Sequence, residues 1–174
     1  MKQIAISFAL LFVALNSYAQ AVNDIVINEG GYTHITEVVQ VPNLSKDDLY
    51  SNCIIWLSEH IYSAKNAIQT ENQQAGLVTV KSHIIAEHPS YMWTFKLTVQ
   101  MKDGRYKYDI TNIAYCATPQ TKQNFLSEIG YDIKDVPVEQ YHWKDTSNWK
   151  RDLYLLFAPT ISSLKKKMAE KSDW

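Results

Sequence analysis

The chain has 174 residues, 46% of them hydrophobic, and its formal net charge at pH 7 is −1. This near-balance of charge argues against a nucleic-acid-binding protein, because such proteins need a net basic face for phosphate contacts. The length and the hydrophobic content are sufficient for one domain with its own core.

The first 19 residues have the pattern of a secretory signal peptide. Lys2 supplies the positive start, residues 4–15 form an apolar run, and Ser17 and Ala19 are small residues at the positions that a signal peptidase reads. The apolar run has about 12 residues, whereas a helix that spans a bilayer needs about 20. We therefore expect cleavage before Gln20, a periplasmic or secreted mature protein, and no transmembrane segment after cleavage.

The rest of the chain divides into a flexible N-terminus over residues 20–31 and a single α+β domain over residues 32–171. Residues 20–31 are polar at first and end in Glu-Gly-Gly, so we expect no regular structure there. Residues 32–41 are rich in β-branched side chains and predict the first strand, which Pro42 ends.

Residues 44–61 (LSKDDLYSNCIIWLSEHI) predict an amphipathic helix. Ser45 is a suitable N-cap, and the two aspartates that follow place negative charge at the positive end of the helix dipole. Cys53 and His60 are residues that could take part in chemistry. They nevertheless lie at helical spacing on the apolar face, which predicts packing rather than catalysis; this face comprises Leu49, Cys53, Trp56, Leu57 and His60.

Further strands are predicted between residues 66 and 116. Residues 66–72 are a candidate for a short strand, and three longer strands cover 77–86, 91–101 and 105–116. The Asp103-Gly104 pair predicts the hairpin between the last two. The apolar pattern shifts by one residue after Ile110, which predicts a β-bulge near Asn112.

Residues 117–143 show no clear pattern, and we expect them to form an excursion over one edge or mouth of the sheet. A final helix is predicted from a cap at Asp145 or Ser147 to Met168, on an apolar stripe of Trp149, Leu153, Leu156, Thr160, Leu164 and Met168. Pro159 inside this helix predicts a kink or two abutting helices.

The strand and helix order predicts an α+β fold. Strands with one apolar face need a cover for that face, and the two amphipathic helices are the only candidates for it. The prediction is an antiparallel sheet of four to five strands with two helices packed on one face, in the order β-α-β-β-β-β-α.

Two segments resemble a known family. VVQVPNLSKDDLYSNCIIWL (Val38–Leu57) and MKDGRYKYDITNI (Met101–Ile113) are similar to the strand-to-helix entry and the hairpin of the secreted bacterial domain-of-unknown-function family 4468. The resemblance covers residues 32–116 and implies a TATA-box-binding-protein-like (TBP-like) fold, in which helices back a curved antiparallel sheet. It implies no catalytic residues, and the name of the fold does not imply DNA binding.

No motif predicts catalysis, a metal site or a cofactor. The sequence contains no nucleophile elbow or Gly-rich phosphate loop, and its histidines lack the spacing of metal ligands. Glu59 and His60 could form an acid–base pair, but we interpret them as a solvated and a packing residue. Cys53 and Cys116 are either a disulfide, which export would permit, or two buried thiols. The sequence therefore leans toward a protein that is not an enzyme.

The polar face of the predicted sheet is either plain solvent surface or a binding platform. The candidates for ligand binding on it are Lys81, Lys96, Lys107 and Asp109, and Tyr141 and Trp143 are candidates for its rim.

From these observations we interpret the chain as an exported, non-enzymatic binding or interaction module of the bacterial cell envelope, with an envelope protein or a glycan as partner. Two alternatives remain. One is a small hydrolase with a site under the 117–143 loop, and the other is a carrier of a small apolar ligand between sheet and helices.

Overall fold

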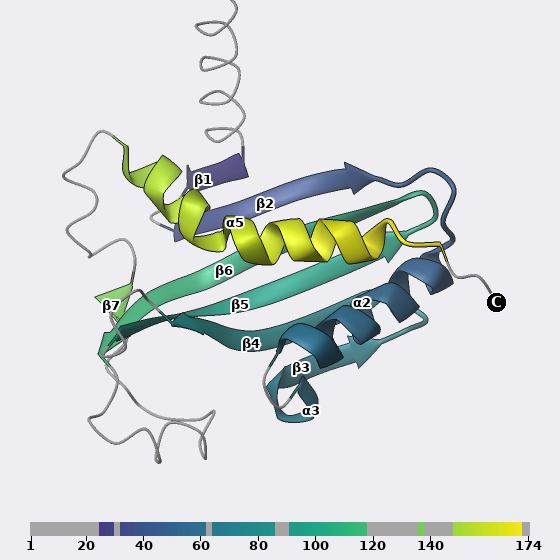
Figure 1. The fold of residues 1–174 in the computed structure, drawn as a ribbon, viewed down its shortest axis with the longest axis horizontal. Coiled ribbons are helices and arrows are strands. Elements are labelled where there is room, and N and C mark those ends of the chain that lie inside the picture. Colours follow the sequence, from purple (N-terminus) through teal and green to yellow (C-terminus); the bar gives the residue numbers. More distant parts are fainter. Residues whose placement is uncertain are drawn as a thin grey trace, which may run out of the picture.

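The computed structural model describes residues 25–29, 32–61, 64–85, 91–117, 136–137 and 148–171. They form two layers, an antiparallel sheet with helices α2 and α5 on one of its faces (Figure 1). In chain order the elements are β1 (Val26–Glu29), β2 (Tyr32–Gln40), α2 (Lys46–His60), α3 (Ala64–Ala67), β3 (Ile68–Asn72), β4 (Leu77–Ile85), β5 (Tyr91–Lys102), β6 (Arg105–Ala117), β7 (Val136–Pro137) and α5 (Trp149–Met168).

The strand order in the sheet is β1-β2-β6-β5-β4-β3, and β7 pairs with the C-terminal part of β6. The predicted α+β class, the antiparallel pairing and the two covering helices are confirmed, but the predicted number of strands was too low. Residues 26–29 were expected to be flexible, yet they pair with residues 32–35 as β1. A four-residue strand is too short to show periodicity, so its pairing depends on the neighbouring strand rather than on its own pattern.

Helix α2 begins where the sequence predicts it. The Ser45 hydroxyl accepts a hydrogen bond from the Asp48 backbone N–H (3.1 Å), and the Asp48 carboxylate accepts one from the Ser45 N–H (3.1 Å). This capping box satisfies two backbone donors at the helix start, and the hydrogen bonds from the Ser45 side chain and backbone lower the pKa of Asp48.

The face of α2 that was predicted to be apolar is buried, except at its C-terminal end. Leu49, Cys53, Trp56 and Leu57 are buried, but His60 is exposed. The His60 ring stacks on the Trp56 ring with 5.3 Å between ring centroids, so it covers the edge of the core without entering it. The prediction of His60 as a packing residue is therefore wrong as to burial.

The β-bulge near Asn112 is confirmed. The pairing of β5 with β6 shifts register between Thr94 and Lys96, and Asn112 has a φ angle of 51°. One extra residue on β6 turns the following side chains to the opposite face. Ile113 consequently returns to the core, where it is 3% exposed.

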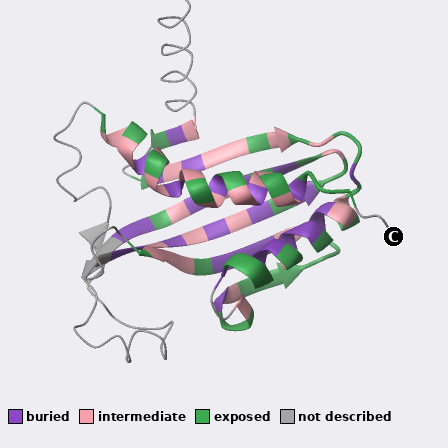
Figure 2. Ribbon diagram, in the orientation of Figure 1, coloured by how far each residue is buried: buried purple, intermediate pink, exposed green. Residues whose placement is uncertain are grey.

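Helix α5 runs through Pro159 as one helix, and its axis changes direction within its N-terminal half (Figure 1). The N-cap of the helix is Asn148, which makes no side-chain capping bond; Asp145 and Ser147, the predicted caps, lie outside the described residues. Its buried stripe, purple in Figure 2, comprises Leu153, Phe157, Ile161, Leu164 and Met168. The predicted stripe was therefore correct at Leu153, Leu164 and Met168, whereas Trp149, Leu156 and Thr160 are only half-buried.

Side-chain hydrogen bonds join the two helices to each other and to the sheet. Trp56 Nε1 donates to Ser163 Oγ (3.0 Å), and Asn52 Nδ2 donates to the Glu170 carbonyl (2.8 Å). Lys165 Nζ lies 2.6 Å from Glu37 Oε2 on β2. Both helices are thus held on the same side of the sheet, and neither contributes to the opposite side (Figure 1).

Candidate functional site

The sheet surface that faces away from α2 and α5 is here called the open face. The strand register places side chains from adjacent strands side by side on it. Lys81 of β4 lies opposite Lys96 of β5, which lies opposite Thr111 of β6. The next row toward the β5–β6 turn holds Thr79, Thr98, Asp109 and Thr36, and the row after that holds Leu77, Gln100, Lys107 and Val38.

All four candidates from the polar strand face, Lys81, Lys96, Lys107 and Asp109, therefore lie on the open face. Lys81 and Lys107 are exposed, and Lys96 and Asp109 are half-buried. The four side chains come from three adjacent strands, β4, β5 and β6, and Lys96 and Asp109 are one row apart. They are therefore spread over the surface of the sheet and do not line a single concave pocket. This arrangement suits the binding of an extended surface more than the chemistry of a single reacting atom.

Asp109 sits near the centre of the open face. His34 Nδ1 lies 3.5 Å from Asp109 Oδ1, which is longer than a strong hydrogen bond. Asp109 Oδ1 is buried and accepts no hydrogen bond from another described residue. His34 was not recognised as a neighbour of Asp109 from the sequence, because residues 32–41 carry apolar side chains at both alternating positions.

The exposed part of the open face does not extend over all of the sheet. Met92 and Ala114 lie on this face beyond the Lys81–Lys96 row, yet they are only 2% and 6% exposed. On β5 and β6 the accessible part therefore runs from the Lys81–Lys96 row to the β5–β6 turn, whereas on β4 it also includes Ile85, which lies opposite Met92 and is exposed.

The predicted rim residues Tyr141 and Trp143 lie outside the described residues, as does most of the 117–143 segment. The hydrolase alternative, which expects a site under this segment, therefore also falls outside the described residues. The structure describes two parts of the segment: Ala117, which is the last residue of β6, and Val136–Pro137, which pairs with Tyr115 and Ala114 of β6.

A cluster of polar residues on the helix side of the sheet serves packing. The Tyr108 hydroxyl donates a hydrogen bond to Glu37 Oε2 (2.7 Å), which also binds Lys165. Burial raises the pKa of Tyr108, and the hydrogen bond to Glu37 raises it further. A phenol with a raised pKa stays protonated at neutral pH and does not act as a base, so we interpret this cluster as an anchor of α5 on β2 and β6.

Cys53 is a buried free thiol in the structure. Burial raises its pKa to about 12, which disfavours the thiolate that a nucleophile requires. The thiol lies close enough to Tyr106 to affect the pKa of that phenol. Tyr106 and Cys116 are ten positions apart on β6, which is roughly 33 Å of extended strand. A disulfide needs Cα atoms within about 7 Å, so the structure does not support a Cys53–Cys116 bond.

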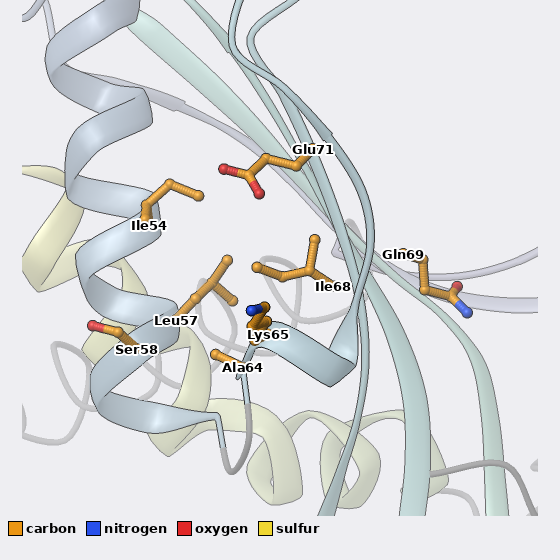
Figure 3. A pocket seen from close by; sticks show the side chains of 8 residues that line it. All are labelled: Ile54, Leu57, Ser58, Ala64, Lys65, Ile68, Gln69 and Glu71. Carbon is orange, nitrogen blue, oxygen red and sulfur yellow. The ribbon is translucent and has the colours of Figure 1, made fainter.

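A cleft between α2 and the β3 edge was not recognised from the sequence. It has a volume of about 480 Å³, within the range of about 300–1,000 Å³ that is common for ligand sites. Figure 3 shows Ile54 and Leu57 pointing from α2 toward Ile68, while Gln69 is turned away. Its lining residues are Ile54, Leu57, Ser58, Ala64, Lys65, Ile68, Gln69 and Glu71.

The charged groups at the cleft differ in their partners. Glu71 Oε1 accepts a hydrogen bond from the Tyr50 hydroxyl (3.0 Å), and burial together with this bond raises the pKa of Tyr50 to about 12. Lys65 makes no ion pair or hydrogen bond to another described residue. The cleft was not visible in the sequence because α2 and β3 meet only in the folded chain.

Within the described ranges, no group of three potential ligands is placed to hold a metal ion. Among the helices of the same ranges, none has the length and apolar character required to cross a bilayer.

Comparison with known proteins supports the fold and gives no activity. Residues 36–116 match the model of the domain of unknown function DUF4468, described as having a TBP-like fold. No curated protein matches the chain.

Two solved structures share the architecture. One is a TBP-like protein from Parabacteroides distasonis, with a TM-score of 0.62 and 12% identity over 85% of this chain and 99% of that chain. The other is a DUF4468 family protein from Bacteroides ovatus, with a TM-score of 0.59 and 13% identity over 86% of this chain and 94% of the other. Residues 36–116 are therefore similar to the DUF4468 family of domains of unknown function, and the chain has the TBP-like fold that is described for this family.

Proposed function

We propose that the chain is an exported, non-enzymatic binding module of the cell envelope, and that it binds its partner through the open face. The single observation that carries the proposal is the placement of both long helices on one face of the sheet (Figure 1). The opposite face presents polar and charged side chains from four adjacent strands in register. A broad surface held rigidly by a sheet is suited to binding a partner without further rearrangement.

The sequence supports the export and non-enzymatic parts of this proposal. Residues 1–19 have the features of a signal peptide, and no catalytic motif is present. Three residues of α2 could take part in chemistry, but each of them has a different environment and they do not form one site. Cys53 is buried, Glu59 lies 3.9 Å from Lys167, and His60 stacks on Trp56.

A bulky substitution in the centre of the open face tests the proposal. We expect Thr98→Trp to abolish the assembly of the chain with its partner, because the indole would hold the two surfaces apart. The measurement is the native size of the chain in an extract of its host's envelope, by size-exclusion chromatography with mass detection. The same sample gives the first residue of the mature chain, which we expect to be Gln20.

Ser162→Trp is the matched control, because Ser162 is exposed on α5 and faces away from the open face. It introduces the same side chain on the helix layer and should leave the assembly intact. A chain that runs as a monomer in every form, or an assembly that survives Thr98→Trp, would contradict the proposal. Equal thermal stability of the two variants would exclude unfolding as the cause of a loss.

The cleft between α2 and β3 supports a second candidate function, the carriage of a small apolar ligand. Ile54 lines the cleft, whereas its neighbour Ile55 is 43% exposed and does not. With the apolar dye 1-anilinonaphthalene-8-sulfonate as probe, we expect Ile54→Ser to weaken binding by about fivefold through lost apolar contact. Ile55→Ser should leave the fluorescence titration unchanged. An equal effect of the two substitutions, or no binding by the native chain, would rule out this candidate.

A further inference from the structure

The open face carries an excess of positive charge that the chain as a whole does not. The formal net charge of the sequence is −1. The register places two acidic residues on the open face, Asp109 and Glu29, whereas it brings five cations to it. These five residues are here called the cationic stripe: Lys81, Lys96, Lys102, Arg105 and Lys107. Lys102 and Arg105 lie opposite each other in the strand register at the β5–β6 turn. The stripe therefore runs from the Lys81–Lys96 row to the end of the β5–β6 hairpin.

The cations of the stripe are not neutralised within the part of the chain that the structure describes. Their side chains form no ion pair or hydrogen bond with another described residue. Some lysines elsewhere are paired, such as Lys165 with Glu37 and Lys167 with Glu170, whereas Lys65, Lys166 and Lys171 form no ion pair with a described residue. The cationic stripe differs from these scattered lysines because its five unneutralised cations share one surface, which no described helix covers.

Lys81 and Lys96 are directly opposite each other on adjacent strands. Side chains at such positions have Cβ atoms about 4.5–5.5 Å apart, and like charges there destabilise the sheet. An anion between the two ammonium groups would remove this repulsion. A carboxylate group fits this position, because its two oxygens can each accept a hydrogen bond from one ammonium group.

Exposed apolar side chains on the same face restrict the class of partner. Six large apolar side chains are exposed among the described residues, and the register places four of them on the open face: Ile27, Tyr32, Val38 and Ile85. Val38 and Ile85 are 53% and 62% exposed. Protein interfaces combine such apolar contacts with charge complementarity, whereas an acidic polysaccharide offers few apolar groups to aliphatic side chains.

We propose that the open face binds an acidic protein surface, whose carboxylates lie on the cationic stripe and whose apolar side chains cover Val38 and Ile85. This inference rests on the proposed function of the open face. A second copy of the chain does not fit, because it would bring the same cations face to face. The partner therefore has a chemistry different from that of this surface.

Three anionic probes distinguish the classes of partner. They are a random copolymer of glutamate and tyrosine, polygalacturonate as an acidic glycan, and phosphatidylglycerol vesicles as an anionic lipid surface. We expect the full chain, as its host processes it, to bind the copolymer most tightly in a titration at low salt. Affinity should fall as salt is added, because exposed charges are screened.

Charge-neutral variants assign the binding to the stripe. We expect Lys81→Gln with Lys96→Gln to weaken binding of the copolymer by about tenfold, since two charge contacts are lost. Lys166→Gln with Lys171→Gln removes the same charge from exposed positions in and after α5, and should change the affinity less than twofold by comparison. Val38→Ser with Ile85→Ser should weaken binding of the copolymer more than binding of polyglutamate.

Equal effects of the two lysine pairs, or polygalacturonate or vesicles binding as tightly as the copolymer, would overturn the inference. Its failure is distinguishable from failure of the proposed function. An assembly that Thr98→Trp abolishes but the Lys81 and Lys96 substitutions leave intact would retain the open face as a binding surface and reject the acidic partner.

Discussion

Phe157→Ala is expected to lower the free energy of unfolding by about 3–5 kcal/mol, as is usual for truncating a fully buried aromatic side chain. Phe157 has no exposed surface. Its ring meets the Phe95 ring edge-on, with 5.2 Å between centroids. The substitution removes the contact by which α5 is seated on β5, and urea unfolding followed by tryptophan fluorescence measures the loss.

Leu155→Ala is the control for this prediction. Leu155 lies on the same helix two residues earlier and is 50% exposed. Its truncation to alanine should change stability by about 0.5 kcal/mol or less, as for most surface substitutions. A loss below about 1 kcal/mol for Phe157→Ala would contradict the placement of α5 on the sheet.

Gly76→Ala is expected to cost more than Gly104→Ala, although both glycines have positive φ angles, of 61° and 73°. Left-handed backbone costs an alanine about 1–2 kcal/mol, and this penalty applies to both positions. A Cβ at Gly76 would lie 2.5 Å from the Met101 carbonyl oxygen, whereas a Cβ at Gly104 would lie 3.5 Å from its nearest neighbour, Pro42 Cα. Only Gly76→Ala therefore adds a clash with backbone.

The clash at Gly76 cannot be relieved without breaking other contacts. The Gly76 carbonyl accepts a hydrogen bond from the Met101 N–H (2.7 Å), which fixes the two segments at their close distance. We expect an additional loss of about 1–3 kcal/mol for Gly76→Ala, the usual cost of overpacking. Thermal or urea unfolding of the two variants side by side measures the difference, and equal stabilities would show that the β3–β4 turn does not approach β5 as described.

Both glycines belong to the end of the sheet where α2 begins. The Lys46 N–H donates to Asp103 Oδ1 (2.8 Å), and the Gly104 N–H donates to the Leu44 carbonyl (2.9 Å). The start of α2 is therefore tied to the β5–β6 turn by hydrogen bonds across 57 and more residues of sequence. The same turn carries Lys102 and Arg105, so the end of the cationic stripe is held by this network.

Features that depend on neighbours in the sequence were predictable. Ser45 caps α2 as expected, because a cap requires only a side chain and the backbone of the next turn. The strand alternation from Tyr91 onward and the bulge at Asn112 were also predicted, since both are read from the period of apolar residues. The buried face of α5 was predicted only in part. Leu156 and Thr160 were assigned to it, whereas the structure buries their neighbours Phe157 and Ile161, which have a similar helical spacing.

The elements that were missed depend on pairing. Residues 26–29 form a strand because they pair with the edge of β2. Their own four side chains do not indicate that such an edge is available for pairing. The predicted disulfide alternative failed for a related reason. Cys53 and Cys116 both belong to apolar patterns in the sequence. The distance between them depends on which part of β6 packs against α2, and only the tertiary structure shows this.

The candidate site shows the same division. The sequence by itself determined which side chains of each strand are polar, and hence that Lys81, Lys96, Lys107 and Asp109 share a face. Only the tertiary structure decided that Lys81 meets Lys96, that His34 approaches Asp109, and that α2 and β3 enclose a cleft. The physical reason is that side-chain direction follows from the local period of a strand, whereas register and strand order follow from packing between segments far apart in the chain.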